Sequence, residues 1–594
     1  MTEDQFNSVY DDHVTRGEQL PTLDDSTDHG TGELNRSVFE LSHSPSQQWR
    51  DNIPIRYHRF LDNKGEIIPT HEGADESWSW ATFFSYAGPG FLVAIAYLDP
   101  GNLEANLQAG AYTKYQLVWV LLGTVLIGLI LQGMAARVGI VTGKHLSQLC
   151  RQEYNSNKWI SLWVMSEISI IASDVQAVIT SAIAFRILFN FPLWFGCVIT
   201  AVDAITFLSL HLLGIRSLES FFVAIVAVMS ICFFWTFSLR LPDPVEVLQG
   251  SLIPTIPSYG LATAVGIVGS LILPQNYYVH SAIVLTREVD RSNPVQVREA
   301  NKYMLADAGV ALFIAFVLNF CVISSFAELF FDKECALAST TSACIADSKN
   351  FHHDSHIYGE CITPDNDAGF CQHIGLSGAD AALEGALGST AGFVWACGLL
   401  ASAQSSTMTI TYAGQFINDG FGEFHIPLYQ RISLCRIAAL IPSVLAATLE
   451  ATYPSAMDDA TQIGNIIASF CVPFSILPML KFCCSTRLMG EHVMDKYQAY
   501  VIAAVATFLI SLNGTLLWEY AFKLDFLLPS EVCAVLGISS TIFYVYLNYL
   551  MVDEEMDELI ANAWQWLRSC GGGGRKSDRD TLDQSGHSTT GLIR

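Results

Sequence analysis

Long apolar segments limit what this chain can fold into more than any other feature of its sequence. Clear examples are residues 117–131, 193–210, 221–237, 311–326, 432–447, 500–512 and 532–549. Each lies in a stretch close to the ~20 residues that a helix needs to cross the bilayer hydrocarbon. Only 15% of the 594 residues are charged, well below the quarter that is usual in soluble proteins. We therefore expect an all-α polytopic membrane protein with about twelve spans.

The parts outside the spans predict the domain organisation. We expect a disordered, acidic cytosolic arm over residues 1–80 and a disordered cytosolic tail over 569–594. The transmembrane domain should cover 81–552, with one repeat at about 81–240, a second at about 259–485, and two extra helices at about 496–552. Basic residues such as Arg137, Lys144 and Arg487 fall in loops that would be internal, which places both termini in the cytosol. The sequence leaves the oligomeric state open, and it leaves the host membrane open between the plasma membrane and an endosomal or vacuolar one.

A polar segment at residues 332–388 should form an external loop. It contains Cys335, Cys344, Cys361 and Cys371, and four cysteines on an oxidising face predict two disulfides. Three pairings are open. The same loop carries histidines at 352, 353, 356 and 373, which are more simply explained as solvated side chains than as metal ligands.

Two apolar segments are interrupted by residues that a continuous membrane helix would avoid. The first contains Asp99-Pro100-Gly101-Asn102 and the second Leu273-Pro274-Gln275-Asn276. They fall in the first and sixth predicted spans, at corresponding positions of two five-helix halves, which is typical of inverted-repeat transporters with a midplane site. Simple proline kinks would explain the prolines. They would leave Asp99 without a reason, although a carboxylate at membrane depth is costly.

Oxygen-rich chemistry at the first break favours a metal ion. Asp99 supplies a charged oxygen, Asn102 a neutral one, and Ala96 a backbone carbonyl, a set that suits a divalent cation that keeps part of its water. An organic carboxylate would be repelled by Asp99. No basic stripe indicates nucleic acid, and no nucleophile–base pair or nucleotide loop indicates an enzyme. The expected partners are therefore divalent cations and the lipid bilayer, with no cofactor apart from the transported ion.

These segments resemble the NRAMP family of metal transporters. The matching motifs, in chain order, are GPGF from Gly88, YLDPGN from Tyr97, LQAGA from Leu107, AARVG from Ala135, AVGIVG from Ala264 and ASAQSSTMT from Ala401. The similarity extends from about Gly88 to Gly490 in the family's order. It implies a leucine-transporter-type fold of two inverted five-helix repeats plus two extra helices, with helices 1 and 6 broken and transport by alternating access.

The resemblance also assigns the metal site. Asp99, Asn102 and the carbonyl of Ala96 match the family's ligands on helix 1. On helix 6 the chain departs from the family: Leu273 replaces a methionine ligand, Gln275 replaces a histidine linked to proton movement, and Ser270 replaces an alanine. On helix 10, Cys471 stands where glutamine is frequent. Losing the thioether removes the selection for soft ions, and neutral oxygens suit harder, better hydrated ones.

The proton route is altered in the same way. The resemblance keeps Asp174 and Arg436, and His280 is a further candidate, but Ala177 stands where a glutamate is expected. This pattern resembles the NRAMP-related magnesium transporters. The resemblance implies transport of Mn²⁺ and Mg²⁺, with Fe²⁺ as a further candidate ion, and weak or absent proton coupling. The alternative is a conventional proton-coupled Mn²⁺/Fe²⁺ symporter. A metal sensor of the plant hormone-signalling type is less favoured, because the tail is too short to form an output domain.

Overall fold

The computed structural model describes residues 78–200, 215–338, 342–346, 357–364, 367–422, 428–453, 455–522, 530–549 and 551. The arm predicted at 1–80 is outside these ranges up to residue 77, and the tail predicted at 569–594 is wholly outside them. Three of the loop histidines, His352, His353 and His356, are also outside the described residues.

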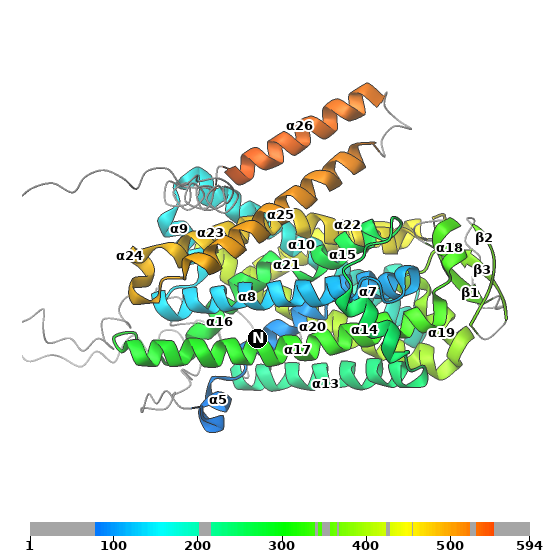
Figure 1. Cartoon of the computed structure of the whole chain (residues 1–594), viewed down its shortest axis with the longest axis horizontal. Helices are drawn as coiled ribbons and strands as arrows, with labels where there is room; N and C mark the ends of the chain where they lie inside the picture. The colour runs from blue at the N-terminus through cyan, green and yellow to red at the C-terminus, as the bar shows by residue number, and fades with distance from the viewer. Residues whose placement is uncertain are drawn as a thin grey trace, which may run out of the picture. The chain divides into compact units, whose positions relative to one another are not determined.

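Helices make up most of the described chain (Figure 1). The first half contains α5 (Trp80–Tyr86), α6 (Pro89–Ala94), η1 (Ile95–Tyr97), α7 (Pro100–Thr113), α8 (Val118–Thr142), α9 (Leu146–Glu153), α10 (Ser156–Phe189), α11 (Leu193–Thr200), α13 (Ile215–Leu239) and α14 (Pro244–Leu252). The second half contains α15 (Leu261–Leu271), α16 (Pro274–Ile283), η2 (Val284–Thr286), α17 (Pro294–Phe330), α20 (Ser389–Phe421), α21 (Leu428–Leu449), α22 (Ala456–Cys471) and α23 (Pro473–Cys484). The chain continues through α24 (Thr486–Met489), η3 (Gly490–His492), α25 (Lys496–Phe522) and α26 (Ser530–Tyr549).

Local sequence signals start several of these helices. Proline, which has no N–H to leave unpaired, occupies the first helical position of α7, α14, α16 and α17. Asp243 and Asn293 cap α14 and α17 by accepting hydrogen bonds from backbone N–H groups at 2.9 and 3.0 Å. Proline and capping residues in the local sequence therefore specify where these helices begin.

Five helical segments of the described ranges are long and apolar enough to cross a bilayer individually, or six if the bent pair Val223–Leu239 and Pro244–Leu252 is counted as one span. The two interrupted spans do not meet this test, because α7, α15 and α16 have only 14, 11 and 10 residues. The chain is thus a multi-pass membrane protein. The number twelve stays a prediction.

Helix packing brings the two halves together. α10 packs along α20, α21 and α22, while α17 packs along α6, α7 and α8. At Gly90 the approach of α6 to α17 is so close that a Cβ would lie 2.6 Å from the backbone carbon of Asp307. The Asp307 carboxylate also accepts from the N–H of Gly90 at 2.6 Å, which satisfies a backbone donor at the start of α6. α6, which is the first half of the first interrupted span, is therefore anchored on α17.

The segment at 332–388, predicted as a polar loop, contains regular structure. It includes α18 (Lys333–Ala338), β1 (Ala343–Ala346), β2 (Gly359–Ile362), β3 (Ala368–Gln372) and α19 (Leu376–Leu387). The strands form an antiparallel sheet in the order β1-β3-β2, beside α18 and α19 (Figure 1). Of the three possible pairings, the disulfides are Cys335–Cys371 and Cys344–Cys361. We call this unit the external lobe, after the side of the membrane that the sequence predicts for it.

Candidate metal site at the helix breaks

The first break follows the predicted residues. The helix ends in the single turn η1, Leu98 interrupts it, and α7 resumes at Pro100. The carbonyls in the break are not left unpaired: Asn319 Nδ2 donates to Tyr97 O at 2.8 Å and Ser402 Oγ donates to Leu98 O at 2.6 Å. Irregular backbone at membrane depth is tolerated when neighbouring helices supply such partners.

Asp99 is placed by its role as the N-cap of α7. It is 2% exposed, and its Oδ1 accepts a hydrogen bond from Asn102 N at 2.9 Å. The helix N-terminus favours a negative charge at this position. Asn102 Nδ2 donates to Ala96 O at 3.3 Å, and no donor among the described residues reaches the buried Asn102 Oδ1. The three predicted helix-1 ligands are thus gathered around one turn, with oxygen lone pairs left for a cation.

The second break lies opposite the first, because α15 packs on α7 and α16 packs on α6. Leu273 is the buried N-cap of α16 and supplies no side-chain ligand atom. Ser270 Oγ donates to Ile267 O at 3.1 Å, so its oxygen keeps its accepting capacity. Gln275 is held by α10: its Oε1 accepts from Ser169 Oγ at 2.7 Å and its Nε2 donates to Ser173 Oγ at 2.8 Å.

On α22, Asn465 contacts the first break, and the assignment of Cys471 as a ligand stays a prediction. Asn465 Nδ2 donates to Gly101 O at 3.2 Å. Cys471 is buried at the end of α22, next to Phe470, whose carbonyl accepts a hydrogen bond from the Tyr544 hydroxyl of α26 at 3.4 Å. Sequence reasoning did not identify Asn465. The available signal was an amide side chain between the apolar residues Ile463 and Ile466 of α22.

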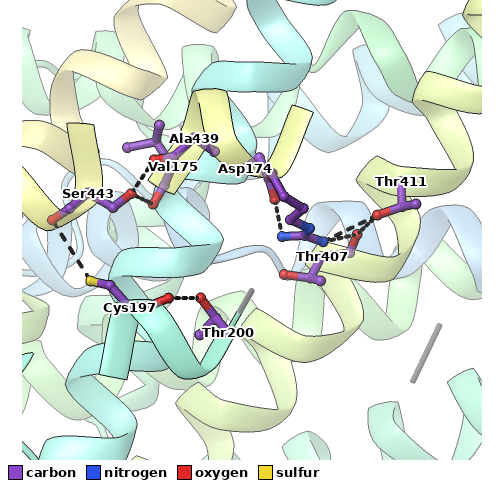
Figure 2. Close-up of polar contacts among 9 residues, drawn as sticks. Asp174, Val175, Cys197, Thr200, Thr407, Thr411, Ala439 and Ser443 are labelled. Carbon is purple, nitrogen blue, oxygen red and sulfur yellow. Dashed lines mark hydrogen bonds and ion pairs between the residues drawn. The ribbon is translucent and has the colours of Figure 1, made fainter. Parts of the chain in front are cut away.

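Asp174 and Arg436 form a buried ion pair between α10 and α21. Arg436 Nη2 also donates to Thr407 O and Thr411 Oγ1 of α20, both at 3.2 Å. Figure 2 shows Asp174 directed toward these threonines. The neighbouring Ala177 is fully buried in an apolar cluster. The carboxylate of this region is therefore neutralised by a permanent cation, and the position of the missing glutamate is apolar.

His280 is connected to the first break through a residue that the sequence did not single out. Its Nδ1 is 2.6 Å from Gln132 Oε1, and Gln132 Nε2 donates to the Tyr97 hydroxyl at 3.4 Å. Gln132 is fully buried in α8. The sequence signal for it was an amide side chain within an apolar segment. These contacts connect Tyr97 in η1, Gln132 in α8 and His280 in α16 beside the first break.

The segment Ile374–Ser377, which connects β3 to α19 within the external lobe, is attached to three transmembrane helices. Leu376 N donates to a Glu104 carboxylate oxygen at 2.7 Å, and the Tyr112 hydroxyl donates to Ile374 O at 2.9 Å. Ser377 donates to Asp458 through its N–H at 3.1 Å and its hydroxyl at 2.6 Å. The helices are α7 through Glu104 and Tyr112, α22 through Asp458, and α10 through Arg186, which donates to Ser377 O.

Comparison with known proteins places this site in a family context. The model of a family described as "Natural resistance-associated macrophage protein-like" matches residues 90–519. "Metal transporter nramp1 homolog" of Dictyostelium discoideum is 36% identical over 492 residues, 82% of this chain and 84% of that protein. "Natural resistance-associated macrophage protein 2" of Mus musculus is 35% identical over 542 residues, 90% of this chain and 92% of that protein. The crystal structure of the Eremococcus coleocola manganese transporter superposes with a TM-score of 0.68 at 25% identity, covering 84% of this chain and 98% of that one.

Proposed function

Since this chain belongs to the NRAMP family of divalent metal transporters, we propose that it carries Mn²⁺ and Mg²⁺ by alternating access around Asp99, with weak or absent proton coupling. The family membership establishes the general function, which is transport of divalent metal ions across a membrane. The chain is a multi-pass transporter with the leucine-transporter-type fold and not an enzyme, and the metal ion is its cargo and not a cofactor.

The neutral character of the helix-6 side supports the choice of ions. Leu273 offers no sulfur where the family's methionine would favour soft cations, so the side chains available are oxygen donors. Asp99 contributes a single charge, and Asn102 and Ser270 contribute neutral oxygens with free accepting capacity. Mg²⁺ is usually bound by one or two carboxylates while it keeps several waters. This donor set fits Mg²⁺ as well as Mn²⁺, and it leaves Fe²⁺ as a further cargo.

The proton-coupling part of the proposal rests on the groups around α10. Gln275 is a neutral amide fixed by Ser169 and Ser173, and Ala177 lies in an apolar cluster, so neither is able to exchange a proton. Asp174 is paired with Arg436. The alternative, a conventional proton-coupled Mn²⁺/Fe²⁺ symporter, would need Asp174, Arg436 or His280 to carry the proton, and the contact of His280 with Gln132 is the observation in its favour.

We also propose that both termini are cytosolic and that the external lobe faces outside the cell or the lumen of an endosome or vacuole. The two disulfides of the lobe support this orientation, because such bonds persist on oxidising faces. Labelling of the lobe cysteines by an impermeant thiol reagent, only after reduction, would agree with this orientation.

Transport by the purified protein in liposomes tests the proposal. Uptake of Mn²⁺ and Mg²⁺ would be followed beside an internal pH dye, with Asp99→Ala as the inactive control. We expect uptake of both ions without acidification, and a Leu273→Met variant that loses Mg²⁺ uptake relative to Mn²⁺ because it gains a thioether. Mn²⁺ uptake with acidification and without Mg²⁺ would reject the proposal in favour of the conventional symporter.

A further inference from the structure

A glutamine on α10 lies against the first break without being one of the predicted ligands. Gln176 is 1% exposed and follows Asp174 by two residues. Its Nε2 donates to Thr461 O and to Asn465 Oδ1 of α22, both at 2.8 Å. Both amide hydrogens are therefore committed, and the plane of the side chain is fixed.

Two glycines allow this glutamine to contact both neighbouring helices. A Cβ on Gly101 of α7 would overlap Asn465 Oδ1 and would lie 2.9 Å from Gln176 Oε1. A Cβ on Gly464 of α22 would lie 2.7 Å from Gln176 Nε2. Because Asn465 also donates to Gly101 O, the three helices meet at a single polar contact. We call Gln176, Asn465 and Gly101 the amide contact.

The amide contact lies on the turn that carries the metal ligands. Gly101 is at the second position of α7, between the cap Asp99 and Asn102. Gln176 Oε1 and Asn102 Oδ1 are both buried and have no hydrogen-bond donor among the described residues. A buried acceptor of this kind is costly unless water or a cation satisfies it. Gln176 Oε1 lies near Gly101, and Asn102 is the next residue of α7, so these two oxygens indicate that a hydrated cation belongs at this turn.

We propose that Gln176 is a positioning residue for the transported ion. Through Asn465 it fixes the first turn of α7 against α22, which sets the orientation of Asp99 and Asn102, and its own Oε1 accepts hydrogen bonds from water that the ion retains. The inference deepens the proposed function and rests on it. It assigns to α10 a role in ion affinity that is separate from the Asp174–Arg436 pair.

The experiment is Mn²⁺ uptake into liposomes as a function of Mn²⁺ concentration, with KM and kcat obtained separately. Gln176→Ala should raise KM about five- to tenfold, the size expected for losing one or two hydrogen bonds, while kcat changes less than twofold, about the scatter of such measurements. Gln176→Glu keeps the shape and loses the N–H donors, so it should also raise KM. Gln372→Ala is the matched control, since Gln372 is a buried glutamine of the external lobe whose side-chain oxygen meets no donor in the described part of the chain.

Further variants keep the inference testable if Gln176→Ala fails to fold. Gly101→Ala disturbs the same contact from α7 and should raise KM in the same way. The double variant Asn465→Ala with Gln176→Ala should have a KM no higher than that of the stronger single variant, because each substitution removes the same contact between Gln176 and Asn465. A KM unchanged in Gln176→Ala, lowered in Gln176→Glu, or raised equally by Gln372→Ala would overturn the inference while wild-type uptake upheld the proposed function. Absence of wild-type uptake would overturn both.

Discussion

The buried ion pair between Asp174 and Arg436 allows a test in which each partner is removed separately. The two side chains are 3% and 5% exposed, and Arg436 has further hydrogen bonds to Thr407 and Thr411. Asp174→Asn leaves a guanidinium without its counter-ion in the membrane interior. Arg436→Gln leaves a carboxylate instead. The two variants differ in how the remaining charge is able to respond.

The expected magnitudes follow from this difference. Removing one partner of a buried ion pair usually costs about 3–5 kcal/mol, because the other charge is left unpaired. The guanidinium of Arg436 is unable to release its proton, so Asp174→Asn should cost this full amount. The carboxylate of Asp174 is able to take up a proton, so Arg436→Gln should cost about 1–3 kcal/mol, which corresponds to its lost hydrogen bonds. The double variant should recover most of the loss.

Thermal unfolding in detergent, compared at one heating rate because such unfolding is often irreversible, would rank the four proteins. The expected order of stability is wild type, then the double variant and Arg436→Gln, with Asp174→Asn the least stable. The reasoning would be refuted if Arg436→Gln were less stable than Asp174→Asn, or if the double variant were the least stable of all.

Three other predictions concern different parts of the molecule. Replacing Cys335 and Cys371 by serine opens a cross-link between residues 36 apart and should cost the external lobe about 2–4 kcal/mol, seen as faster limited proteolysis of the lobe; an unchanged cleavage rate would contradict this. Asn513 begins a glycosylation sequon but is 1% exposed and bonded to Ser469 and Tyr544, so glycosidase treatment should leave the protein's mass unchanged at this site. Gln275→His combined with Ala177→Glu supplies two groups able to exchange protons, and Mn²⁺ uptake by this variant should acidify the liposomes; no acidification would show that other residues prevent coupling.

Both helix breaks are predictable from the sequence because their cause is local. Pro100 and Pro274 have no N–H to donate and disfavour helical backbone in the residue before them, so each stands at the start of a new helix. Pro442 and Pro478 lie inside α21 and α23, so the polar residues beside Pro100 and Pro274 are part of the signal. Asp99 is predictable as a ligand for an equally general reason, since a carboxylate at membrane depth needs a partner. The resemblance of the surrounding motifs then extends these local signals to the whole fold.

The contacts of the site are not predictable in the same way, because they depend on which face of each helix meets its neighbour. Cys471 and Asn465 lie six residues apart on α22, which separates them by roughly 120° around the helix axis. The resemblance pointed to Cys471, which stays a prediction, and it did not identify Asn465, which the packing of α22 on α7 brings to Gly101. Gln132 and Gln176 were missed because a buried amide looks the same in sequence whether it joins helices or faces a site.

The disulfide pairing was open for a related reason. Cys344 lies opposite Cys371 in the β1–β3 register, yet Cys371 bonds to Cys335 and Cys344 bonds to Cys361. Pairing therefore depends on where α18 and β2 pack beside the sheet, which the spacing of the cysteines does not specify.

The attachment of Ile374–Ser377 to three transmembrane helices has a pharmacological consequence. In the proposed orientation, alternating access requires the helices on the side of the lobe to separate. Their separation would have to break hydrogen bonds that begin at Ile374, three residues after the disulfide-bonded Cys371. A ligand shifts a conformational equilibrium only by its difference in affinity for the two states. Suppose that an antibody binds the lobe a hundredfold more tightly when Ile374–Ser377 is hydrogen-bonded to the three helices than when these bonds are broken. It would stabilise the hydrogen-bonded state by about 2.7 kcal/mol. Such an antibody would be an inhibitor that never reaches the ion.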